Sequence, residues 1–161
     1  MNQFKKKSKR AVALYGIASL LVLAVIYSQS LFSREASGNL SGFVMRILKP
    51  LLDPNDRIDH ELFHFWIRKA AHFTEFSALG LCLGGFSVHL GALNHRRYIA
   101  LPMLFGLGAA VSDEFLQYFT GRGSMVTDVV LDFSGALTGL AFIWLLDFIH
   151  RRGRKGRKNE Q

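Results

Sequence analysis

Long apolar runs alternate with short polar segments along the chain. The first run covers residues 11–28 and contains no charged residue, and three more cover about 66–90, 99–119 and 126–149. A helix needs about 20 mostly apolar residues to cross a hydrocarbon core of ~30 Å. The pattern therefore predicts an all-α polytopic membrane protein with four transmembrane helices. An alternative for the first run is a signal peptide, because small residues suited to cleavage follow it.

A further short helix is expected in the longest polar connection, residues 31–65. Apolar positions recur there every four residues at Phe43, Ile47 and Leu51. This spacing predicts an amphipathic helix within residues 38–52 that lies at the membrane interface. Two prolines are expected to end it, Pro50 and Pro54.

The positive charges indicate how the helices are oriented. Of the 20 Lys and Arg residues, thirteen lie in residues 1–10, 96–97 and 151–158. Such clusters stay on the cytoplasmic side, which predicts a basic cytoplasmic head, a membrane domain over residues 11–149 and a basic cytoplasmic tail over residues 150–161. Because these clusters flank apolar runs, they indicate membrane topology and argue against a nucleic-acid partner.

Eight ionisable residues interrupt the apolar runs or lie at their edges. They are Arg68, Lys69, His72, Glu75, Asp113, Glu114, Asp128 and Asp132. A charged side chain at the bilayer centre costs roughly 2.5–3.5 kcal/mol on insertion scales, so these residues are expected to face one another or water. Since successive spans run in opposite directions, all eight fall in the outer half of the membrane. We therefore expect one polar site near the outer surface.

Helical spacing indicates which of these residues share a face. Three sets recur every three or four residues: Arg68, His72 and Glu75; Asp113 and Gln117; and Asp128 and Asp132. Arg122 lies in the turn between the last two spans, where it is placed to cap the cluster. The alternative is a set of salt bridges that only lock the helices together.

Small residues four apart occur in two of the spans. Gly80 and Gly84 belong to the second span, and Gly135 and Gly139 to the fourth. This spacing lets a neighbouring helix approach closely, either within the chain or in a homo-oligomer. The single cysteine, Cys82, permits neither a disulfide within the chain nor a cysteine-based metal site.

Three segments carry the eight ionisable residues: R-K-A-A-H-F-T-E-F (68–76), S-D-E-F-L-Q-Y-F-T-G-R (112–122) and D-V-V-L-D-F-S-G-A-L-T-G (128–139). Together they resemble the VanZ-like family of small bacterial membrane proteins over roughly residues 60–145. The resemblance implies a multi-pass envelope protein of the bacterial cytoplasmic membrane. Some relatives are linked to low-level resistance to the glycopeptide teicoplanin, and the family supplies no established reaction.

The matching motif positions are Arg68, Lys69, His72, Glu75, Asp113, Glu114, Gln117, Arg122, Asp128 and Gly135. The chain departs from the family pattern at three positions. Phe76 replaces a favoured Tyr, Thr120 a common Pro, and Asp132 a usual Asn. The last change adds a carboxylate to the expected site.

These observations predict a site that binds, and modifies, an anionic lipid or lipid-linked wall precursor, with an effect on glycopeptide susceptibility. The acid/base residues would be His72, Glu75 and Asp113. The substrate-binding residues would be Arg68, Lys69, Glu114, Gln117, Arg122, Asp128 and Asp132.

Two other functions stay open. His72, Glu75, Asp113 and Asp128 could hold a metal ion in a membrane hydrolase, although no compact ligand motif is present and the sequence assigns no metal ligand or cofactor. The other alternative is a non-enzymatic membrane scaffold whose charges are structural.

Overall fold

The computed structural model describes the whole chain except residues 1, 32–33, 54, 56, 122–124 and 160–161. The described residues form five α-helices and no strand, which confirms the all-α class. In chain order these are α1 (Asn2–Ser30), α2 (Arg34–Leu52), α3 (His60–Asn94), α4 (Ala100–Phe119) and α5 (Val126–Asn159).

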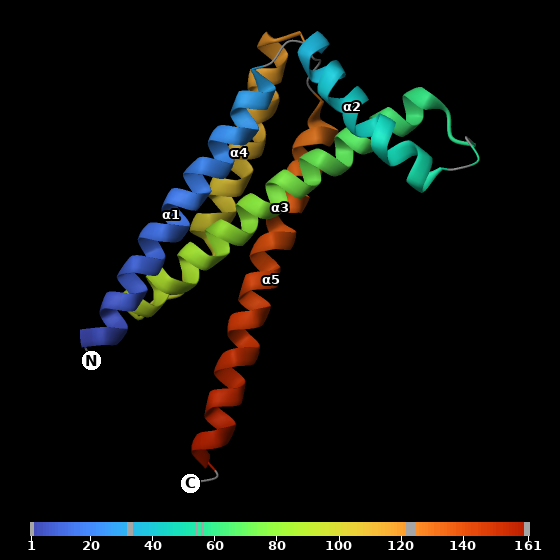
Figure 1. Ribbon diagram of the computed structural model, residues 1–161. Helices are drawn as coiled ribbons and strands as arrows, with labels where there is room; N and C mark the ends of the chain where they lie inside the picture. The colour runs from blue at the N-terminus through green and yellow to red at the C-terminus, as the bar shows by residue number, and fades with distance from the viewer. Residues whose placement is uncertain (1, 32–33, 54, 56, 122–124, 160–161) are drawn as a thin grey trace.

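The long helices form an elongated bundle (Figure 1). Helices α1 and α4 run upward in this view, and α3 and α5 run downward, so both chain ends and the turn from α3 to α4 lie toward the lower end. Helix α3 crosses the bundle obliquely and contacts all four other helices. It therefore connects the parts of the fold, and α2 packs against its first half (Figure 1).

Three helices are long and apolar enough to cross a membrane, α1, α3 and α5. The sequence predicted a fourth span, and α4 occupies that place with 20 residues. Its last two turns carry Asp113, Glu114 and Gln117, which lower its apolar character. The fourth span therefore remains a prediction.

Helix α2 is longer than the sequence predicted. It begins at Arg34 and ends at Leu52, and Pro50 lies inside it rather than ending it. A proline removes the hydrogen bond to the carbonyl four positions earlier, and its ring crowds that carbonyl. Here only two residues of the helix follow it, so the helix ends shortly after Pro50 rather than at it. The side chains of Phe43, Ile47 and Leu51 are exposed, and the location of α2 at the membrane interface stays a prediction.

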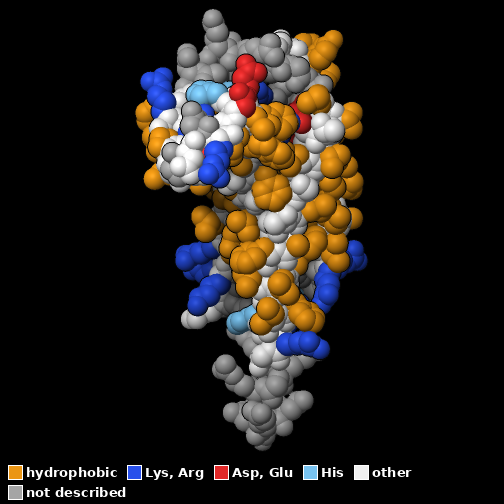
Figure 2. All heavy atoms as spheres, turned by 90° about the vertical axis from the view of Figure 1, so that its right-hand side faces the viewer, with side chains coloured by type: hydrophobic (Ala, Val, Ile, Leu, Met, Phe, Trp, Pro, Cys, Tyr) orange, Lys and Arg blue, Asp and Glu red, His pale blue; other side chains and the backbone are white. Residues whose placement is uncertain are grey.

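Small residues fill much of the interior, and many large apolar side chains lie outside. The buried core includes Ala109, Ala110 and Ala136, whereas Leu20 and Phe105 are more than 60% exposed. Hydrophobic side chains cover the middle of the face shown in Figure 2, with Lys and Arg toward both ends and acidic side chains near the upper end. This distribution suits a protein surrounded by lipid.

Glycines bring the backbones of α3 and α5 into direct contact. A Cβ atom on Gly80 would overlap the carbonyl oxygen of Ala136, and one on Gly139 would overlap that of Ser77. Gly84 lies in the same way against the side chain of Ile143. The small-residue segments predicted from the sequence therefore pack against each other within one chain.

We expect Gly80→Leu and Gly139→Leu to destabilise the protein by at least about 1–3 kcal/mol, the usual cost of overpacking. The measurement is the unfolding temperature of the purified protein in detergent, together with its abundance in membranes. Gly108→Leu on α4 is the matched control, because nothing lies within 4 Å of a Cβ atom there. Equal stability of all three variants would show that the α3–α5 contact does not require glycine.

Candidate functional site

A polar cluster lies where the upper halves of α3, α4 and α5 meet. Asp113, Glu114 and Gln117 from α4 and Asp132 from α5 are each at most 3% exposed. His72 from α3 lies beside them with 19% of its side chain exposed. Ionisable groups from three helices therefore share one interior region.

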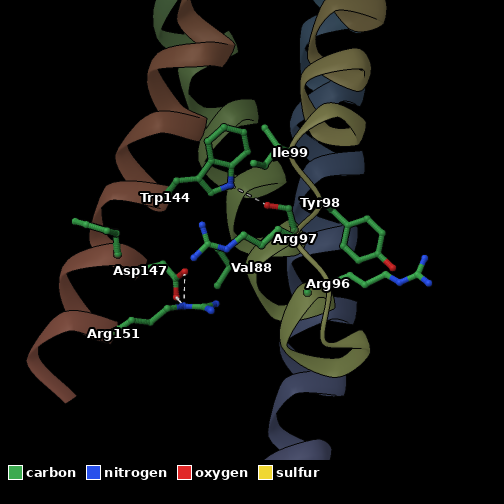
Figure 3. Close-up of a pocket in the computed structure, with 11 residues that line it drawn as sticks. Val88, Arg96, Arg97, Tyr98, Ile99, Trp144, Asp147 and Arg151 are labelled. Carbon is green, nitrogen blue, oxygen red and sulfur yellow. Dashed lines mark hydrogen bonds and ion pairs between the residues drawn. The ribbon is translucent and has the colours of Figure 1, made fainter. Parts of the chain in front are cut away.

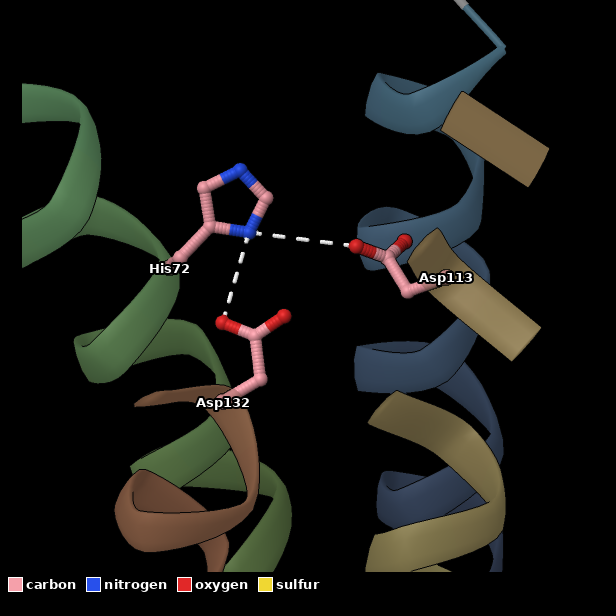
Figure 4. A group of neighbouring side chains, drawn as sticks. All are labelled: His72, Asp113 and Asp132. Atoms are coloured by element: carbon pink, nitrogen blue, oxygen red, sulfur yellow. Dashed lines mark ion pairs between the residues drawn. The ribbon is translucent and has the colours of Figure 1, made fainter. Parts of the chain in front are cut away.

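His72 directs one ring nitrogen at two carboxylates (Figure 4). Its Nδ1 atom lies 3.6 Å from Oδ1 of Asp132 and 3.8 Å from Oδ2 of Asp113. Both distances exceed the 2.7–3.2 Å typical of a hydrogen bond. The other ring nitrogen, Nε2, points away from both carboxylates (Figure 4).

Asp113 is held in place by two neighbours. The Ser30 hydroxyl donates a hydrogen bond of 2.5 Å to its Oδ1 atom, and the Gln117 amide donates one of 2.7 Å to its Oδ2 atom. Thr120 donates in turn to the carbonyl oxygen of Ser30. Gln117, predicted as a substrate-binding residue, is thus placed to orient a carboxylate.

Asp132 differs from Asp113 in its surroundings. Its side chain is 1% exposed, and neither carboxylate oxygen has a hydrogen-bond partner among the described residues. Within that part of the chain, His72 is the only residue that forms an ion pair with it. A buried carboxylate in this state is costly unless a proton or a cation compensates its charge.

The other predicted residues have partners of their own. Lys69 forms an ion pair with Asp128 in the first turn of α5. Glu114 accepts a hydrogen bond of 3.0 Å from the backbone N–H of Met125, which fastens the start of α5 to α4.

Three predicted residues remain, and two polar residues were not predicted. The Nε atom of Arg68 is buried and has no hydrogen-bond partner among the described residues. Glu75 accepts a hydrogen bond of 2.9 Å from the side chain of Gln29, whereas Arg122 lies outside the described residues. Gln29 and Ser30 were not predicted from the sequence, yet both contact the cluster. The available signal was their position at the outer end of the first apolar run, level with the other polar residues.

A separate hollow lies at the opposite end of the bundle (Figure 3). Its volume is about 140 Å³, and Arg96, Arg97 and Trp144 are among the residues that line it. Asp147 in its wall forms an ion pair with Arg151. None of the residues predicted to form the functional site lines this hollow.

The fold and the cluster together define an all-helical membrane protein with buried carboxylates and a histidine gathered toward one end of its bundle. A family model described as VanZ/LLP1 matches residues 15–147, and the chain belongs to this family. The match includes every residue of the cluster described above. No curated protein and no solved structure matches the chain.

The Lys69–Asp128 pair predicts strong coupling between the two positions. Lys69→Met and Asp128→Asn should each destabilise the protein, because each leaves one half-buried charge without its partner. The double variant should be more stable than the sum of the single effects predicts, with an interaction energy of about 0.5–3 kcal/mol. The measurement is the free energy of unfolding of the wild type, both single variants and the double variant in detergent. Additive effects of the two substitutions would contradict a structural ion pair.

Proposed function

We propose that this VanZ/LLP1-family protein binds the anionic headgroup of a lipid or lipid-linked wall precursor at the polar cluster, and modifies it there. The observation that carries the proposal is the partly exposed His72 facing two buried carboxylates, Asp113 and Asp132. Replacing buried ionic groups by apolar ones often leaves stability unchanged or raises it. Fold stability alone therefore gives little reason for such a cluster.

Arg68 is the residue best placed to hold a phosphate or carboxylate. It lies one helical turn before His72 on the same face of α3. Its Nε atom is buried and has no hydrogen-bond partner among the described residues. A guanidinium can donate two parallel hydrogen bonds to such an anion. Lys69 and Arg122 are proposed as further contacts with the headgroup.

An apolar groove beside the cluster suits the tail of a lipid. It has a volume of about 390 Å³ and is lined by residues of α1, α3 and α4, including Leu23, Leu79 and Ala109. Ala109 lies one helical turn below Asp113, so the groove begins close to the polar groups. An amphiphile could place its headgroup at the cluster and its tail along this groove.

The proposed orientation has α1, α3, α4 and α5 as four spans, with α2 at the interface. Both termini and the basic pair at 96–97 would be cytoplasmic, because Lys and Arg clusters stay on that side. The shared end of the two termini and the α3–α4 turn supports this arrangement (Figure 1). The cluster would then open to the outer leaflet, where a modified wall precursor could alter susceptibility to teicoplanin.

His72→Ala should abolish the effect of the protein on envelope lipids while leaving its membrane abundance near that of the wild type. The experiment compares the lipids and wall precursors of a deletion strain complemented with each variant. His89→Ala is the matched control, since His89 stacks on Tyr15 about 25 Å further along the same helix. A molecule that accumulates in the deletion strain should persist with His72→Ala and disappear with His89→Ala.

A scaffold function makes the opposite prediction. In that case the His72→Ala protein, if present in membranes at normal levels, would restore the wild-type lipid profile. That result would remove the basis for a modifying site at the cluster.

A further inference from the structure

Among the described residues, no hydrogen bond compensates the charge of Asp132, and its only ion pair there is with His72. Asp113 accepts hydrogen bonds from Ser30 and Gln117, and Glu114 accepts one from Met125. The Asp132 carboxylate is equally buried, yet neither of its oxygens has a hydrogen-bond partner among the described residues. It points into the space that it shares with His72 and Asp113 (Figure 4). Such a group needs either a proton or a cation.

The spacing of the surrounding atoms suits a cation. His72 Nδ1, a carboxylate oxygen of Asp113 and one of Asp132 all lie within 4.8 Å of one another. Bonds of about 2.0–2.2 Å to a tetrahedral ion place its ligand atoms roughly 3.3–3.6 Å apart. The ring nitrogen lies 3.6 and 3.8 Å from the two oxygens. These distances are too long for hydrogen bonds and close to those that one shared ion would set.

We propose that His72, Asp113 and Asp132 bind a divalent transition-metal ion, Zn²⁺ or Mn²⁺. One imidazole nitrogen with two carboxylate oxygens is a donor set that both ions accept. Three protein ligands leave at least one coordination position for water or a substrate oxygen, as in catalytic sites. This set differs from the one considered from the sequence, which included Glu75 and Asp128.

The neighbours of the three ligands support this assignment. Ser30 and Gln117 orient the carboxylate of Asp113, and hydrogen bonds of this kind are typical around metal ligands. His72 presents Nδ1 to both carboxylates and turns Nε2 away (Figure 4).

As a reaction centre, this metal site rests on the function proposed above. The ion would polarise a phosphoryl or acyl oxygen of the bound headgroup and would lower the pKa of a bound water molecule. His72 would then serve as a ligand. Metal binding itself requires no lipid substrate, so it can be measured separately.

The test uses the full-length protein, purified in detergent, stripped with a chelator and dialysed against Zn²⁺ or Mn²⁺. The wild type should retain one ion per chain. The Asp132→Asn and His72→Ala proteins should bind the ion at least about ten-fold more weakly. Even the loss of a residue that only hydrogen-bonds to a metal ligand lowers metal affinity by this much. Asp147→Asn is the control, since this residue of α5 pairs with Arg151 at the far end of the bundle. It should bind the ion like the wild type.

Two results would overturn the metal site. In one, the wild type binds no ion; in the other, it binds the ion no more tightly than the Asp132→Asn protein. If Asp132 simply carries a proton, its replacement by the isosteric neutral Asn should leave the stability of the protein unchanged. Added metal should then not change the stability of the wild type either.

Co²⁺ substitution in the wild type provides a measurement that does not depend on the folding of variants. Ligation should give a visible absorption band, and its absence would count against the site.

A metal-loaded protein with no effect on envelope lipids would contradict only the proposed function. A metal-free protein with a normal effect on these lipids would contradict only the metal site.

Discussion

The direct contact between the backbones of α3 and α5 determines the geometry of the rest of the structure. Lipid supplies no hydrophobic force between helices, so close packing and polar contacts must hold them together. The two helices run in the same direction (Figure 1), and Gly80 and Gly139 lie against the opposite backbone. This contact fixes the register of α3 against α5. Since His72 and Asp132 each lie about two turns before these glycines on the contacting faces, the same register places them opposite each other. The glycines therefore position the polar site as well as the helices.

The hydrogen bonds around the cluster show how the fold tolerates charge in an apolar setting. Asp113 is held from two helices, by Ser30 at the end of α1 and by Gln117 on its own helix. Glu114 is used to fasten the start of α5. These contacts satisfy buried carboxylates and also tie the end of α1 and the start of α5 to α4. Only Asp132 lacks such support among the described residues, and it is the carboxylate nearest to His72. Among the described carboxylates of the cluster, the one without a hydrogen bond thus lies where chemistry is proposed.

The sequence predicted much of the architecture because its signals are local. Apolar periodicity identified the long helices, and the direction of each span predicted that the charges gather at one end. Spacing alone could not show which carboxylates face His72. Asp128 and Asp132 share one face of α5 and differ by about 6 Å along its axis, so only the packing register separates them. Ser30 was not predicted for another reason. Its residue type is uncharged and points to no particular chemistry, so only its position at the end of an apolar run indicated that it lies level with the polar cluster. The span at α4 is ambiguous because the polar residues that form the site also reduce its hydropathy.

The charged residues fall into two layers, and under the proposed function each layer would have its own role. Lys69 and Asp128 lie three and four residues before His72 and Asp132 on their helices, so their ion pair is nearer the upper end and partly exposed. His72, Asp113 and Asp132 lie deeper along the bundle. The two carboxylates there are at most 1% exposed, whereas His72 keeps 19% of its side chain exposed. An arriving anion would meet Arg68 and Lys69 first, where it could compete with Asp128 for the ammonium group. Deeper entry would bring it to the His72 centre, where the low dielectric strengthens every electrostatic contact. The outer layer would thus select for negative charge, while the inner layer acts on the molecule selected.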